Sequence, residues 1–152
     1  MGTEAQVRIA HELLRAINAG DAAGAMALFD QRYAGIDVAD PTPQRGREDV
    51  GRAIERYLEA FPDLRIEAET TVTEEERVAL FWTATGTHRG LLMHIPPTGR
   101  PVDVRGVALL RIEREKIVEG LYLWDVAGLL RSVGLLPDLS VDVRVCPPAV
   151  AS

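Results

Sequence analysis

Apolar side chains recur every three or four positions along the first sixty residues, which is the period of an amphipathic helix. The pattern predicts a helix up to Asn18, a short second helix capped by Asp21, and a third helix over residues 50–61 that Pro62 ends. Two prolines lie between residues 33 and 45, a stretch that we expect to form a strand and a loop. The first part of the chain is therefore predicted to be mainly helical.

From Leu64 onward, apolar and polar residues alternate, which is the period of a half-buried strand. The alternation predicts strands over residues 64–73, 78–88, 101–112 and 117–125, and a short helix over 126–133 that Gly134 ends. Helices followed by a run of antiparallel strands indicate an α+β fold rather than a doubly wound sheet. In such a fold, helices cover one face of a long curved sheet, and we expect a cavity between the two layers.

The hairpin at residues 113–116 determines which residues of the last two long strands face this cavity. If Glu113 pairs with Lys116, then Leu121 lies opposite Ala108 and Leu123 lies opposite Gly106. The small residues Gly106 and Ala108 leave space where a filled core would hold larger side chains. We therefore expect a substrate site lined by Val104, Gly106, Ala108, Leu110, Leu121, Leu123, Tyr33, Phe61, Trp82 and Met93.

Asp125 ends the same face and permits two interpretations. A carboxyl group beside an apolar gap is suited to proton transfer, because a desolvated carboxyl group exchanges protons more readily near neutral pH. Asp125 also directly precedes residues 126–130, so its side chain could simply cap the short helix. The spacing alone favours the cap, and the two functions could compete for one side chain.

The opposite face of the hairpin is too apolar for a free surface and too charged for a core. It is predicted to carry Val107, Tyr122 and Trp124 together with Arg105. Aromatic residues and arginine are enriched at protein interfaces, so we expect a homodimer through Val107, Tyr122 and Trp124. The alternative is that the tail from Leu135 onward folds back over this face.

Composition narrows the classes of function without selecting one. The 152 residues suit one domain, with a core at about residues 5–135 and a tail over 136–152. A net charge of −6 without a basic patch argues against nucleic-acid binding, and no apolar run is long enough to span a membrane. The lone Cys146 excludes an internal disulfide, and the acidic N-terminus lacks a secretion signal, so we expect a cytoplasmic protein. The three histidines lack helical metal-binding spacing, and we expect no metal ion.

Five segments together resemble the SnoaL-like polyketide cyclases. They are Ala60–Arg65, Phe81–Gly90, Ile95–Arg100, Arg111–Glu113 with Lys116–Glu119, and Trp124–Leu130. The resemblance covers roughly residues 5–135. It implies a cone-shaped α+β barrel related to nuclear transport factor 2 and to scytalone dehydratase.

The resemblance also implies an activity. Cyclases of this family close a ring of an aromatic polyketide by intramolecular aldol condensation, without a cofactor or a metal. The acid/base of these enzymes is the aspartate of a Trp/Tyr-Asp-x-x-Gly motif, which is Asp125 here. Two histidines common in the family are missing, because Ile36 and Gly120 stand at their positions. The sequence therefore does not identify a residue that would polarise the acceptor carbonyl.

Divergent members of the family hydroxylate anthracycline-type polyketides of antibiotic biosynthesis without a metal or flavin of their own. That chemistry needs a reduced aromatic substrate that reacts with dioxygen, and hence a separate reductase. Three functions remain open, namely cofactor-free hydroxylation of a reduced anthracycline-type polyketide, aldol cyclisation, and binding of a small molecule without chemistry. The missing histidines favour the first.

Overall fold

The structure is a computed structural model and describes residues 3–137. Its elements follow in the order α1 (Thr3–Asn18), α2 (Ala22–Met26), β1 (Phe29–Asp37), β2 (Gln44–Arg45), α3 (Gly46–Ala60), β3 (Arg65–Glu74), β4 (Arg77–Thr87), β5 (Pro101–Glu113), β6 (Lys116–Trp124) and α4 (Val126–Ser132). The predicted α+β fold is confirmed, and the predicted helices and strands are present within a few residues of their expected bounds. The predicted tail over 136–152 lies, from residue 138 on, outside the described residues.

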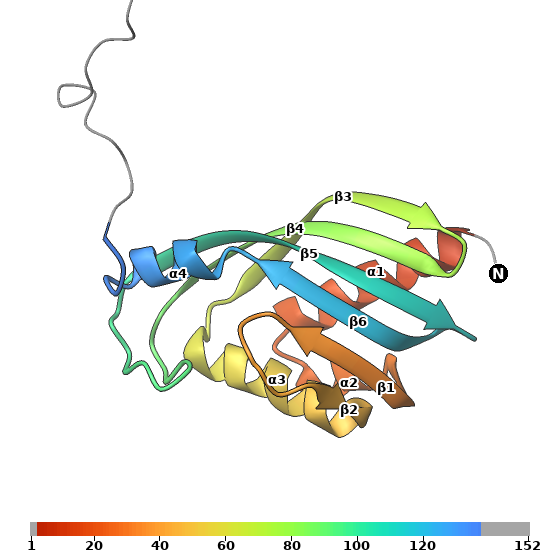
Figure 1. Ribbon diagram of the computed structural model, residues 1–152, viewed down its shortest axis with the longest axis horizontal. Coiled ribbons are helices and arrows are strands. Elements are labelled where there is room, and N and C mark those ends of the chain that lie inside the picture. The colour runs from red at the N-terminus through yellow and green to blue at the C-terminus, as the bar shows by residue number, and fades with distance from the viewer. Residues whose placement is uncertain (1–2, 138–152) are drawn as a thin grey trace, which may run out of the picture.

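The six strands form one curved sheet in the order β2-β1-β6-β5-β4-β3. β1 runs parallel to β6, and every other neighbouring pair is antiparallel. The sheet bends over α1 and α3, which pack against one of its faces, while α4 follows the end of β6 (Figure 1). The parallel pair brings Asp37, the last residue of β1, directly beside Tyr122 of β6.

A β-bulge in β6 changes which residues face the helices. Ile112 pairs with Ile117 as predicted, but the next pair is Arg111 with Glu119, so Val118 is an extra residue on β6. Beyond the bulge, Ala108 pairs with Tyr122 and Gly106 pairs with Trp124. A shift of one residue exchanges the two faces of a strand. The predicted pairings of Leu121 with Ala108 and of Leu123 with Gly106 are therefore wrong.

Two apolar clusters fill the space between the sheet and the helices. The larger cluster joins Leu13 of α1 and Val50 of α3 to Leu80 and Leu110 of the sheet. The smaller cluster lies near α4 and is built from Phe61, Ala84, Val104 and Leu129, with neighbouring apolar residues. Trp82 packs against both clusters. Within residues 3–137, no helix combines the length and the apolar character that crossing a membrane requires.

Candidate functional site

A cavity of about 170 Å³ lies between the helices and the facing side of the sheet. This volume is similar to that of a protein cavity that binds benzene, so it has room for about one aromatic ring. Most of its walls are apolar. Examples are Leu13, Ile17, Val50, Ile54, Leu80 and Ala84.

Four of the predicted lining residues reach the cavity, namely Phe61, Trp82, Val104 and Ala108. Gly106 faces the same side of the sheet, but it leaves no open space. A Cβ atom at this position would lie 2.3 Å from the indole of Trp82 and 2.7 Å from the Cβ of Trp124. The space that the glycine leaves is thus occupied by two tryptophans.

The other predicted lining residues lie elsewhere. Leu121 and Leu123 point to the opposite face of the sheet because of the bulge. Leu110 is fully buried in the larger apolar cluster, and Met93 lies in a loop with 39% of its surface exposed. Tyr33 is only 1% exposed and stands behind the cavity wall, where its hydroxyl contacts two residues that line the cavity.

Asp125 lies outside the cavity lining. Its side chain is exposed and its Oδ1 accepts a hydrogen bond of 2.8 Å from the backbone N–H of Gly128, at the start of α4. The capping interpretation of Asp125 is therefore confirmed. The predicted position of its carboxylate beside the ligand is corrected, because Trp124 rather than Asp125 turns toward the cavity.

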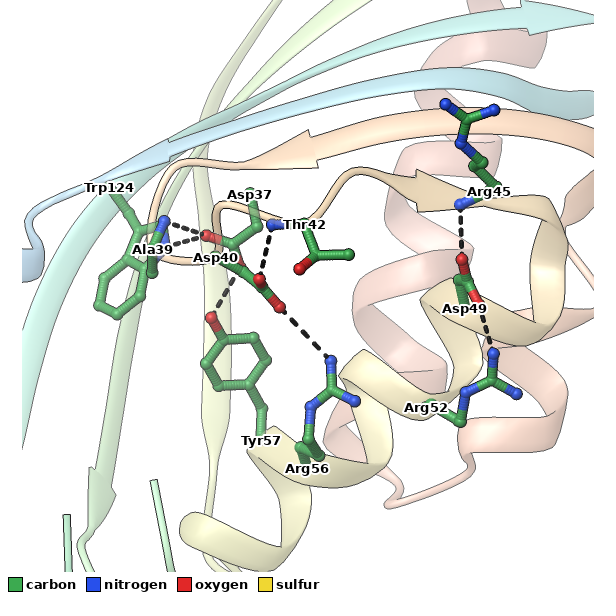
Figure 2. A network of polar contacts seen from close by, with 10 residues as sticks. All are labelled: Asp37, Ala39, Asp40, Thr42, Arg45, Asp49, Arg52, Arg56, Tyr57 and Trp124. Carbon is green, nitrogen blue, oxygen red and sulfur yellow. Dashed lines mark hydrogen bonds and ion pairs between the residues drawn. The ribbon is translucent and has the colours of Figure 1, made fainter. Parts of the chain in front are cut away.

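A different carboxylate, that of Asp37, lies at the cavity. Asp37 is only 7% exposed and contributes to the lining. Its Oδ1 accepts hydrogen bonds of 2.9 Å from the N–H of Ala39 and from Nε1 of Trp124, and its Oδ2 accepts one of 2.6 Å from the hydroxyl of Tyr57. Figure 2 shows these three donors converging on Asp37. Since a carboxylate offers about four lone-pair positions, roughly one remains for a ligand.

The position of Asp37 follows from the pattern of β1. Tyr33, Gly35 and Asp37 alternate with more exposed residues, so all three share the buried face of this strand. The chain turns directly after Asp37, and the N–H of Ala39 in that turn binds its carboxylate. We did not predict this residue from the sequence. The alternation over residues 33–37, ending in an acidic residue, was the available signal.

Tyr57 and Trp124 fix the orientation of the Asp37 carboxylate. Burial, followed by the charge of Asp37, raises the pKa of Tyr57 above that of an exposed phenol. Tyr57 therefore remains a hydroxyl donor through the physiological pH range. The indole N–H of Trp124 is a donor at any pH, and the two rings meet edge to face with their centroids 6.2 Å apart.

A second polar group, which we call the tyrosine pair, consists of Tyr33 and Tyr122. Their hydroxyl oxygens lie 2.8 Å apart, and the Tyr33 hydroxyl donates a hydrogen bond of 2.9 Å to Oε1 of Gln44. Tyr122 and Gln44 line the cavity. Burial is the main cause that raises the pKa of both tyrosines, so both stay protonated near neutral pH.

The part of the chain that the structure describes contains no group of three or more His, Cys, Asp or Glu side chains arranged to hold a metal ion. His88 is fully buried, and its Nδ1 lies 3.0 Å from the hydroxyl of Thr98. It does not contribute to the cavity lining. The polar chemistry of the cavity therefore comes from Asp37, the tyrosine pair and their partners.

Comparison with known proteins gives a family match. The sequence matches the model of the SnoaL-like polyketide cyclase family over residues 7–133. No curated protein sequence matches the chain.

Several solved structures have a similar fold. AclR of Streptomyces galilaeus, provisionally described as a hydroxylase, is 30% identical with a TM-score of 0.80, and 91% of each chain is covered. IdmH of Streptomyces antibioticus, provisionally described as a polyketide cyclase, is 27% identical over 85% of this chain and 98% of its own, with a TM-score of 0.72. TsrD of Streptomyces laurentii is 24% identical over 90% and 99%, with a TM-score of 0.81, and shows a likeness of fold alone.

Proposed function

This chain belongs to the SnoaL-like polyketide cyclase family, and on that premise we propose that it tailors an aromatic polyketide by proton transfer inside the cavity. In this proposal Asp37 accepts the proton, and the protein needs no cofactor or metal of its own. The substrate is a reduced polyketide of the anthracycline type, and the reaction is hydroxylation. The cavity has room for about one ring, so the ring that enters it is the ring that reacts.

The observation that carries the proposal is a buried carboxylate in an otherwise mainly apolar cavity. Tyr57 and Trp124 hold the carboxylate of Asp37 in one orientation, and the surrounding walls are mainly apolar. A positioned base in a dry site is suited to abstract a proton from a ligand hydroxyl or an acidic carbon. Asp125, on the exposed side, lacks that environment.

Hydroxylation needs two electrons, and the reduced substrate supplies them. Asp37 accepts the proton of a ring hydroxyl, and the resulting electron-rich anion adds dioxygen to form a hydroperoxide. Loss of water from the hydroperoxide gives a hydroxyquinone. One hydroquinone and one dioxygen thus become one hydroxyquinone and one water. A separate reductase has to supply the hydroquinone.

Aldol cyclisation is the second candidate, and the tyrosine pair favours it. In that reaction Asp37 removes a proton from the carbon between two carbonyls, and the carbanion attacks a ketone. The oxygen of that ketone becomes negative in the transition state and needs a hydrogen-bond donor. Tyr122 lies beside Asp37 in the neighbouring strand and could supply it. The similarity to AclR supports the hydroxylase and the similarity to IdmH supports the cyclase.

Isotope labelling distinguishes the two reactions. We expect the protein, incubated with a chemically reduced anthraquinone under ¹⁸O₂, to release a hydroxyanthraquinone that carries one ¹⁸O atom, measured by mass spectrometry. A parallel incubation without protein corrects for spontaneous oxidation. Absence of enzyme-dependent label, together with ring closure of a linear aromatic polyketone, would replace the hydroxylase by the cyclase.

We also propose a homodimer through the outer face of the sheet, with a corrected set of residues. Tyr122 and Trp124 face the cavity, so of the three residues predicted to form the dimer contact only Val107 remains on this face, next to Arg105. The outer face instead carries exposed apolar side chains from five strands or their ends, namely Ile36, Val38, Val72, Phe81, Leu109 and Leu123. Some of the charges beside them are paired within the chain, as in Arg105 with Glu69 at 3.3 Å. An exposed, largely apolar patch of this kind suits a second copy related by a twofold axis.

Replacing Leu123 with Glu should disrupt that dimer. Leu123 is 44% exposed and lies on the outer face, so a charge there would be buried without a partner. We expect wild type to sediment as a dimer and Leu123→Glu as a monomer. Leu91→Glu, at an exposed leucine outside the sheet, is the matched control and should remain a dimer. A monomeric wild type, or a dimeric Leu123→Glu variant, contradicts the proposal.

A further inference from the structure

The two polar groups of the cavity lie on neighbouring strands. Asp37 of β1 and Tyr122 of β6 are register partners in the parallel pair, and both contribute to the cavity lining. The donors around Asp37 are already used, because Tyr57 and Trp124 both point their hydrogens at its carboxylate. A ligand oxygen that needs a donor must therefore find it at the tyrosine pair or its partner Gln44.

The fold makes specific room for the hydroxyls of the tyrosine pair. Gly35 and Gly120 are register partners on β1 and β6. A Cβ atom on Gly35 would lie 1.9 Å from the hydroxyl oxygen of Tyr33. A Cβ atom on Gly120 would lie 2.5 Å from the hydroxyl oxygen of Tyr122 and 2.6 Å from that of Tyr33. The two hydroxyls thus occupy the space of two absent side chains, and no larger residue fits at either position without moving them.

The hydrogen-bond chain leaves a donor for the cavity in either of its arrangements. Each tyrosine hydroxyl has one hydrogen. If Tyr33 donates to Gln44, then Tyr122 donates to Tyr33, and the amide N–H₂ of Gln44 is free of protein partners among residues 3–137. If the amide of Gln44 is turned over, Gln44 donates to Tyr33, Tyr33 donates to Tyr122, and the hydroxyl hydrogen of Tyr122 is free. Both residues line the cavity.

We propose that the ligand selects the second arrangement, in which Gln44 donates to Tyr33 and Tyr33 donates to Tyr122, and that the free hydroxyl hydrogen of Tyr122 then binds an oxygen atom of the ligand. The inference rests on the proposed function and adds the chemistry of the substrate. The ring that enters the cavity carries a ketone, enol or phenol oxygen, placed next to the atom that gives its proton to Asp37. Tyr122 touches this oxygen, whereas Tyr33 stands behind the wall and acts as a positioning residue.

An acceptor-only probe isolates this site from Asp37. The ketone oxygen of 1-tetralone can accept a hydrogen bond but cannot donate one to a carboxylate, and tetralin has nearly the same shape without the oxygen. We expect wild type to bind 1-tetralone about threefold to tenfold tighter than tetralin, the scale of one net hydrogen bond. We also expect the carbonyl stretch of bound 1-tetralone to move to lower frequency in the infrared spectrum.

Three variants give the matched comparison. Tyr122→Phe should abolish both the preference for the ketone and the carbonyl shift. Tyr33→Phe removes a hydroxyl that is not in the cavity wall, and it should reduce the shift because Tyr122 and Gln44 lose their common partner. Tyr57→Phe removes a cavity hydroxyl that is bound to Asp37 and should keep both signals.

If the preference for the ketone and the carbonyl shift both persist in Tyr122→Phe, this inference is wrong. It is also wrong if wild type binds both probes equally and shows no shift. The proposed function would then still stand on Asp37. If neither probe binds wild type, the cavity is no aromatic site, and the inference and the proposed function fail together.

Discussion

Asp37→Asn is expected to reduce turnover by about 10²-fold or more, the scale of general acid–base catalysis. The amide has the shape of the carboxylate, but it cannot accept a proton from the substrate near neutral pH. The variant should still fold, because the amide oxygen can keep hydrogen bonds from the donors around it, although loss of one would cost about 1–3 kcal/mol. Steady-state rates together with the thermal midpoint separate lost chemistry from lost folding.

Asp125→Asn is the matched control for this experiment. Asn is as good as Asp at the start of a helix, so the cap on α4 is retained. We expect Asp125→Asn to leave turnover essentially unchanged. If Asp125→Asn lost turnover and Asp37→Asn kept full activity, the acid/base would be Asp125, as the Trp-Asp-x-x-Gly motif implies.

Ala108→Leu should close the cavity. Ala108 lies between Leu80 and Tyr122 on the neighbouring strands and faces the ligand space. Overpacking costs about 1–3 kcal/mol, and a bound ring would compete for the same volume, so affinity for 1-tetralone should fall by about tenfold or more. Calorimetric titration measures the affinity, and circular dichroism confirms the fold.

Val107→Leu controls for the added volume on the same strand. Val107 directly precedes Ala108 and points to the outer face, so this change should leave the affinity for 1-tetralone unchanged. Equal affinity in wild type and Ala108→Leu would show that the ligand does not use this cavity. Gly106→Leu would be a poorer test, because a side chain there would meet Trp82 before it reached the ligand space.

The order and type of the helices and strands could be predicted because those signals are local. A helical period ending at Asn18 and a strand period over 64–73 depend only on neighbouring residues. The lining contributed by Val104 and Ala108 followed from the same alternation. Both residues lie on β5, which has a regular alternation and does not contain the extra residue.

The bulge could not be predicted from the residues around it. Val118 is a good strand residue in a strand pattern, and nothing in its type marks it as the extra position. The register depends on the packing of the whole sheet. In the observed register Tyr122 and Trp124 face the helices, whereas Leu121 and Leu123 face outward. Every error on β6 in the predicted site and interface follows from this single shift.

Asp37 was missed for another reason. Its importance comes from partners that are distant along the chain, since Tyr57 and Trp124 are 20 and 87 positions away. Asp125 was predicted as the proton-transfer residue because it belongs to a motif of consecutive residues. The structure separates the two parts of that motif, because Trp124 binds Asp37 while Asp125 caps α4.

The extra residue at Val118 also bears on how this site is inherited. Loss of one codon at the bulge would turn the side chains of Leu121 and Leu123 inward and those of Tyr122 and Trp124 outward, with no residue replaced. The number of residues in β6 therefore partly determines which side chains line the cavity. Two relatives with matching residues at these positions can have different cavities if one of them lacks the bulge, and strand register has to be compared before side chains are.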